Sequence, residues 1–87
     1  MYTVEYEPDA LKSLKKMNKH TALFITAWIG KNLVQCKNPR NHGKGLSANR
    51  AGSWRYRIGN YRIIACINDK TKVIALLNIG HRSTIYK

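Results

Sequence analysis

The N-terminal residues follow a pattern of apolar and polar side chains that indicates a β-strand and then a helix. The stretch YTVEYE, residues 2–7, has the two-residue period of a strand, and the Pro-Asp pair after it ends the strand and opens a helix. In the next turns Leu11, Leu14 and Met17 recur at helical spacing, while lysines cover the remaining positions. A short amphipathic helix is therefore expected.

A second helix is predicted from an N-cap at Thr21 to about Gln35. One face of this helix carries an apolar row that consists of Ala22, Ile25, Ile29, Leu33 and Cys36. Phe24 and Trp28 lie beside the row, four residues apart. Such an aromatic pair on an apolar helix is expected to pack in the core.

The C-terminal half predicts a long connection and then three strands. Glycine, proline and asparagine are frequent in residues 37–53, which is typical of a connection. The three strands are predicted over residues 54–58, 61–67 and 72–79, with turns at Gly59-Asn60 and at residues 68–71. The order β-α-α-β-β-β predicts one α+β domain, residues 1–87, with two N-terminal helices on one face of a mainly antiparallel four-stranded sheet.

The hairpin around Gly59-Asn60 places like charges opposite each other. With a two-residue loop Ile58 faces Tyr61, so Arg57 faces Arg62, at a cost of up to about 1 kcal/mol. The same register gives an apolar face for the helices, made of Trp54, Tyr56, Ile58, Tyr61, Ile63, Ala65 and Ile67. Arg55, Arg57 and Arg62 share the other face. Because the arginine fork suits phosphate, three arginines together indicate a phosphate site.

The charge distribution supports a polyanionic partner. The chain has 16 Lys and Arg residues against 4 Asp and Glu, a formal charge of +12. Its acids are Glu5, Glu7, Asp9 and Asp69, so the long segment between Asp9 and Asp69 is basic without interruption. A solvated face usually mixes both signs. We therefore expect a nucleic acid partner in preference to an anionic membrane.

The first residues have neither the basic nor the apolar region of a secretion signal, and no apolar stretch is long enough to span a bilayer. A soluble, cytoplasmic protein without a membrane partner is expected. Cys36 and Cys66 follow no metal-ligand spacing, so we expect both to be small buried thiols and expect no metal.

Two segments, AGSWRYRIGNYRII and LLNIGHRSTIYK, resemble the RelE/ParE superfamily of bacterial toxins, and within it the RelE-like branch of messenger RNA endoribonucleases. The resemblance extends over nearly the whole chain, because the family has the same order of strands and helices. It implies the toxin of a type II toxin–antitoxin pair, with a cognate antitoxin as partner. It also implies cleavage of messenger RNA, typically in the ribosomal A site, without metal or another cofactor.

The resemblance also implies functional positions, which correspond to Lys44, Arg55, Arg57, Arg62, Arg82 and Tyr86. Metal-free RNA cleavage needs a base for the 2′-OH proton, cations for the charge on phosphorus and an acid for the leaving oxygen. We expect Arg57, Arg62 and Arg82 to hold the scissile phosphate. Arg55 and Lys44 are expected to position the backbone beside it.

The proton acceptor is harder to identify from the sequence. Arginine cannot release its proton in a protein, and Arg55 and Arg57 stand where the best-known family pattern has lysines. Lys44 and Tyr86 are candidates, and His81 is the side chain that titrates nearest neutral pH. The hypothesis is that His81 and Tyr86 share the proton transfers.

Further RNA contacts are expected outside the hairpin. The candidate residues are Arg50 in the connection and Lys12, Lys15 and Lys16 on the first helix. We expect the helix lysines to bind a polyanion such as ribosomal RNA without reading its sequence. Any exposed part of the pair Phe24 and Trp28 is a candidate groove for the antitoxin.

Two other functions remain open. A gyrase-inhibiting relative from the ParE branch would poison its partner without cleaving RNA, and a non-catalytic RNA-binding module would also explain the charge. The ParE branch is not expected to need the set Arg57, Arg62, Arg82 and Tyr86. A binding module gives no reason to place arginines opposite each other, so the sequence favours the nuclease.

Overall fold

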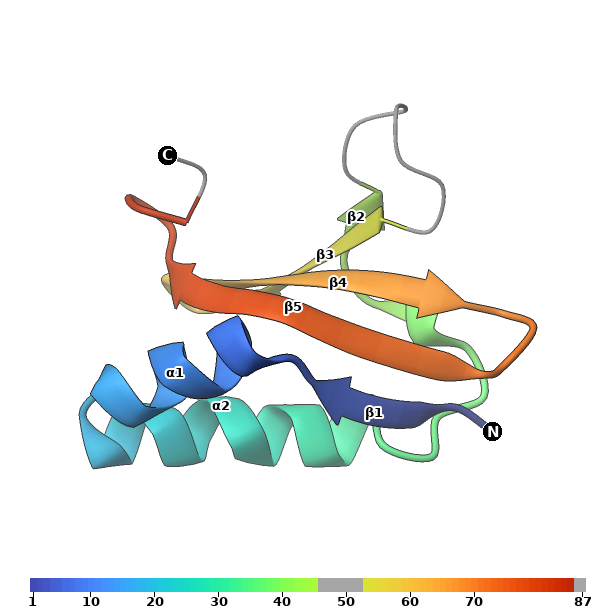
Figure 1. Cartoon of the computed structure of the whole chain (residues 1–87), viewed down its shortest axis with the longest axis horizontal. Helices are drawn as coiled ribbons and strands as arrows, with labels where there is room; N and C mark the ends of the chain where they lie inside the picture. The colour runs from blue at the N-terminus through green and yellow to red at the C-terminus, as the bar shows by residue number, and fades with distance from the viewer. Residues whose placement is uncertain (46–52, 86–87) are drawn as a thin grey trace.

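The computed structural model describes residues 1–45 and 53–85. Its elements are β1 (Thr3–Tyr6), α1 (Pro8–Lys16), α2 (Lys19–Asn32), the 3-10 helix η1 (Pro39–Asn41), β2 (Lys44–Gly45), β3 (Ser53–Ile58), β4 (Tyr61–Asn68) and β5 (Val73–His81). The strands form a five-stranded sheet in the order β1-β5-β4-β3-β2, in which β1 runs parallel to β5 and the other neighbours are antiparallel. Both helices lie on one side of the sheet, below it in Figure 1.

The α+β class, with two helices on a mainly antiparallel sheet, is confirmed, but the predicted number of four strands was wrong. The fifth strand is β2, which lies inside the segment predicted as a connection. Two residues give no alternation that a sequence pattern could reveal, and β2 forms only because the chain returns to the edge of β3.

The second helix begins earlier and ends earlier than predicted. Asn18, not Thr21, is its N-cap, because the Asn18 side chain accepts a hydrogen bond of 2.8 Å from the His20 backbone N–H. The helix ends at Asn32, and Gln35 adopts a left-handed backbone with φ of +62°. The chain therefore turns toward the sheet where the prediction continued the helix.

The core lies between α2 and the sheet. Its fully buried side chains include Ile25, Ile29, Leu33, Tyr56, Ile63, Ile74, Leu76 and Ile79. Burial of each such side chain is worth about 1.5–3 kcal/mol relative to exposure. The predicted apolar face of the hairpin is confirmed, because its central members are buried and Trp54 and Tyr61 pack at its margin.

Two apolar residues of the helices lie outside the core. Leu11 is 43% exposed, and the buried position of α1 is Ala10. Phe24 is 59% exposed, so the prediction that it packs in the core with Trp28 was wrong. Trp28 does pack against the core, with its ring centroid 5.8 Å from that of Tyr56.

The register of β3 and β4 is the predicted one, with Ile58 opposite Tyr61 and Arg57 opposite Arg62. Gly59 opens the two-residue loop with φ of +57°, a conformation that costs glycine little. Between β4 and β5 the register shifts by one residue at Ile64/Ala65. This bulge lets Leu76 and Ile79 both point into the core although they are three positions apart.

Candidate functional site

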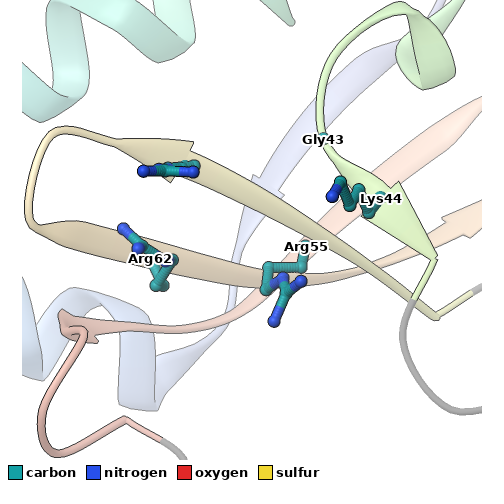
Figure 2. Close-up of a pocket in the computed structure, with 5 residues that line it drawn as sticks. Gly43, Lys44, Arg55 and Arg62 are labelled. Atoms are coloured by element: carbon teal, nitrogen blue, oxygen red, sulfur yellow. The ribbon is translucent and has the colours of Figure 1, made fainter.

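A pocket of about 290 Å³ opens on the face of the hairpin that points away from the helices. Its lining consists of Gly43, Lys44, Arg55, Arg57 and Arg62. Figure 2 shows Lys44 on the short strand β2, with Arg55 and Arg62 on the two strands of the neighbouring hairpin. The described lining is therefore made of four cationic side chains and one glycine, with no acid among them.

The sheet register builds this cluster directly. Lys44 is the partner of Arg55 across β2 and β3, and Arg57 is the partner of Arg62 across β3 and β4. Cβ atoms of directly opposed residues are about 4.5–5.5 Å apart. Arg55 and Arg57 are two positions apart on β3, so they share a face, while Tyr56 between them is buried. Four positive side chains are thus held on adjacent ladder positions.

Arg62 is oriented by the hairpin loop. Its guanidinium nitrogen Nη1 donates hydrogen bonds of 3.0 Å to the Gly59 and Tyr61 carbonyl oxygens. These two bonds satisfy one nitrogen and fix the plane of the fork, while guanidinium has further donors. Arg62 can therefore bind an anion without first losing its orientation.

Gly43 allows β2 to approach β3 closely, and sequence reasoning did not single it out. It has φ of +80°, and a Cβ at this position would overlap the Arg55 carbonyl oxygen and lie 2.7 Å from Trp54 Nε1. Only glycine fits this position without displacement. The available signal was the glycine-rich stretch HGKG, which the sequence marks only as part of a connection.

His81 lies on the other face of β5. It is the register partner of Tyr61, whose ring packs against the core, and the two ring centroids are 5.5 Å apart in an edge-to-face arrangement. Its Nδ1 lies 2.8 Å from Ser83 Oγ and accepts a hydrogen bond of 3.1 Å from the Ser83 N–H. The bulge in β5 sets this orientation. The structure does not bring His81 together with the arginines of the pocket.

Arg82 begins the turn that follows β5 and is exposed. Its backbone N–H donates a hydrogen bond of 2.8 Å to the Asn60 carbonyl oxygen, which ties the turn to the hairpin loop. Arg82 therefore lies at the loop end of the hairpin, and it is not among the described residues that line the pocket.

The turn after β5 folds back over the sheet, on the side away from the helices (Figure 1). A Cβ on Gly80 would lie 3.1 Å from Ile85 Cδ1, so Ile85 covers Gly80, which is the register partner of Arg62. The chain is thus directed back toward the arginine pair at Ile85. The next predicted site residue, Tyr86, lies outside the described residues, as does Arg50.

The lysines of the first helix do not join the pocket. Lys12, Lys15 and Lys16 are exposed on α1, on the opposite side of the sheet from the hairpin arginines (Figure 1). They form a separate basic surface. Two groups of predicted RNA-binding residues therefore lie on elements at opposite sides of the sheet.

The described residues contain no group of three or more His, Cys, Asp and Glu side chains that could hold a metal ion. Cys36 and Cys66 are free thiols, and both are half-buried where buried thiols were predicted. Burial raises the pKa of Cys36. In the part of the chain that the structure describes, every helix is too short or too polar to cross a membrane.

Comparison with known proteins places the fold among bacterial and archaeal toxins. The toxin RelG of Mycobacterium tuberculosis is 28% identical over 86 residues, which cover 99% of this chain and 97% of RelG. The RelBE2 toxin–antitoxin complex of the same organism contains a chain with a TM-score of 0.82 and 27% identity, with coverage of 94% of this chain and 92% of that chain. The isolated RelE toxin of E. coli has the same fold, with a TM-score of 0.71 at 17% identity and coverage of 99% and 92%.

The fold, two helices on a mixed five-stranded sheet, is thus that of these small toxins. The family model described as the ParE toxin of type II toxin–antitoxin systems matches residues 4–86, so the chain belongs to this family, within the RelE/ParE superfamily. A toxin of this class has a cognate antitoxin as its partner, and solved complexes of relatives contain both proteins.

Proposed function

We propose that this toxin is an endoribonuclease that cleaves messenger RNA and so inhibits translation. The observation that carries the proposal is the pocket, in which Arg57 and Arg62 face each other across the ladder with Arg55 and Lys44 beside them. A like-charge pair destabilises the free sheet, and a bound phosphate removes this cost. The relatives named RelG and RelE favour the RelE-like branch over gyrase inhibition.

The proposed reaction is attack of the ribose 2′-OH on the adjacent phosphate. The O2′–P bond forms and the P–O5′ bond breaks, so the products carry a 2′,3′-cyclic phosphate and a 5′-OH. One proton leaves O2′ and one is added to O5′. Arg57 and Arg62 stabilise the negative charge that develops on the phosphate oxygens in the transition state. Arg55 holds the neighbouring RNA backbone, and Arg82 lies beyond the hairpin loop as a further phosphate contact.

Proton transfer within the pocket is assigned to Lys44. Arginine stays protonated, whereas lysine can release and regain a proton. His81, the carrier expected from the sequence, faces Tyr61 on the other side of β5. Tyr86 keeps its predicted role as the second group in proton transfer. The proposal therefore pairs Lys44 with Tyr86 and gives His81 a structural role in the turn after β5.

The second basic surface, formed by the exposed lysines of α1, is proposed to bind the ribosome. Lys12, Lys15 and Lys16 are exposed on α1, and this helix lies on the opposite side of the sheet from the pocket. They contact a second polyanion, ribosomal RNA, while the pocket holds the message. The proposed cleavage accordingly depends on the ribosome and takes place in the cytoplasm.

The antitoxin is proposed to dock on α2. Leu23 and Phe24 are adjacent on this helix and are 58% and 59% exposed, although both are large and apolar. Lys19 and Lys31 are exposed near the two ends of the same helix. An amphipathic antitoxin segment with acidic residues at its margins complements this surface in both respects.

Primer extension on a translated message tests the nuclease proposal. We expect wild type to produce cuts inside codons and Arg57→Ala to lose them by at least about a hundredfold, since one charged contact in a transition state is worth several kcal/mol. Lys70→Ala, in the exposed turn between β4 and β5, is the matched control and should cut like wild type. Absence of cuts with wild type, together with inhibition of DNA supercoiling, would instead establish the gyrase function.

A further inference from the structure

The connection between α2 and β2 is tied to β3 at two points before it enters the pocket. The Tyr56 hydroxyl donates a hydrogen bond of 2.6 Å to the Pro39 carbonyl oxygen, and Trp54 Nε1 donates one of 2.6 Å to the His42 carbonyl oxygen. Burial raises the pKa of Tyr56, so its hydroxyl keeps the proton that it donates. The residue after His42 is Gly43, the first residue of the pocket lining. The backbone is therefore held just before it reaches the site.

A third tie joins this connection to the turn between β4 and β5. Arg40 donates two hydrogen bonds to the Asp69 carboxylate, with Nη1–Oδ1 and Nη2–Oδ2 distances of 2.9 and 3.1 Å. The Tyr2 hydroxyl donates a bond of 2.6 Å to the same Oδ1. The Arg40 Cζ lies 5.9 Å from the centroid of the Trp54 ring. Arg40 thus links the carboxylate to the indole that holds His42.

Strand β2 has little to hold it in place by itself. It has two residues, both exposed, and its pairs are Lys44 with Arg55 and Gly45 with Trp54. Short pairings of this kind are marginal in water. The residues that precede Lys44, which the structure describes, therefore contribute to its position.

We infer that Trp54 and Arg40 are positioning residues that hold Lys44 opposite Arg55, through the His42 carbonyl and Gly43, and so set the width of the pocket. Neither residue is in the described lining, and neither needs to touch RNA. The inference rests on the proposed function for its catalytic consequence. Its structural part, the anchoring of β2, stands independently of any activity.

The test compares Trp54→Phe and Asp69→Asn with the control Lys70→Gln. Trp54→Phe keeps an aromatic ring beside Arg40 and removes the Nε1 donor. Asp69→Asn weakens the pair that Asp69 forms with Arg40, and because Asp69 lies at the protein surface, this variant is expected to fold. The first measurement is amide hydrogen exchange by NMR across residues 43–45. We expect exchange there to accelerate at least about tenfold in both variants and to match wild type in the control.

The second measurement is the kinetics of message cleavage on ribosomes. Misplacement of a side chain in the pocket slows the reacting step, so kcat should fall at least about tenfold in Trp54→Phe while KM changes less than about threefold. Asp69→Asn should also lower kcat, and Asp69→Glu, which keeps the carboxylate, should restore most of that lost activity. Recovery of this kind would separate positioning from a general loss of folded protein.

The inference is overturned if exchange at residues 43–45 stays unchanged in both variants. It is also overturned if exchange accelerates and kcat does not fall. If wild type cleaves no RNA, the proposed function fails, and affinity for a 2′-O-methyl RNA oligonucleotide replaces kcat as the second measurement. Weaker binding by Trp54→Phe than by Lys70→Gln would then support the anchoring role, and equal binding would refute it.

Discussion

Arg57 and Arg62 are direct partners across the β3–β4 ladder, and the described residues around them supply no carboxylate to neutralise either charge. Asp69, which is the one acid of the sequence after Asp9, is held by Arg40 and Tyr2 at the turn between β4 and β5. The pocket therefore keeps a net positive charge that favours an anion. The loss of stability that this charge causes in the free protein can be measured separately from its contribution to anion binding.

Replacement of Arg57 by threonine should stabilise the fold while it removes activity. Arg57→Thr abolishes the cross-strand repulsion and introduces a residue that favours strands, so the free energy of unfolding should rise by up to about 1 kcal/mol. Urea denaturation at low salt measures this change. The gain should shrink in 1 M NaCl, because salt screens exposed charges. A loss of stability at both salt concentrations would contradict the proposed repulsion.

Gly43 and Gly45 offer a matched pair of substitutions. Gly43→Ala should destabilise by more than about 1 kcal/mol, since its backbone is left-handed and its Cβ would overlap the Arg55 carbonyl oxygen. At Gly45 a Cβ would be 3.6 Å from the Trp54 ring, an ordinary contact, so Gly45→Ala should be nearly neutral. Urea denaturation and message cleavage check both variants. Equal behaviour of the two would argue against a close approach of β2 to β3.

The Asp69 carboxyl should make stability depend on pH in the acid range. Hydrogen bonds from Arg40 and then Tyr2 lower the pKa of Asp69 from 3.8 to about 2. Because the pKa of Asp69 is lower in the folded state, the carboxylate stabilises the fold fully when the pH is above the pKa of the unfolded state. This stabilisation is lost as the pH falls through the pKa of the folded state. Wild type should therefore lose stability more steeply than Asp69→Asn between about pH 4 and pH 2. Thermal unfolding across this range measures both slopes, and parallel curves would exclude the tie.

We expect the exposed face of α2 to bind the antitoxin and to take no part in RNA cleavage. Phe24→Ser removes an apolar side chain that is 59% exposed, so its effect on the free energy of unfolding should stay within about 0.5 kcal/mol. Message cleavage should be unchanged, whereas more antitoxin should be needed to stop it. Leu11→Ser, at an apolar position of α1 that is 43% exposed, is the control. If the same ratio of antitoxin to toxin neutralises Phe24→Ser and wild type, the antitoxin docks on another surface.

The sequence alone determined the hairpin and the division of its two faces. A two-residue loop fixes which residues stand opposite each other, and the period of two then determines on which face of the sheet each side chain lies. Arg57 opposite Arg62 and the buried Tyr56 followed from these local rules, and both are present in the structure. The basic character of the segment between Asp9 and Asp69 needed only the positions of the charged residues along the chain.

Tertiary structure decided how the rest of the site is assembled. The bulge in β5 turned His81 toward Tyr61, and β2 brought Lys44 and Gly43 to the edge of β3. Arg40 and Asp69, which hold that edge, are 29 residues apart in the chain. Local periodicity carries no information about such contacts, because they form only when separate segments pack together. The arginine pair was therefore readable from the sequence, whereas Gly43 and the contacts that hold Lys44 beside Arg55 were not.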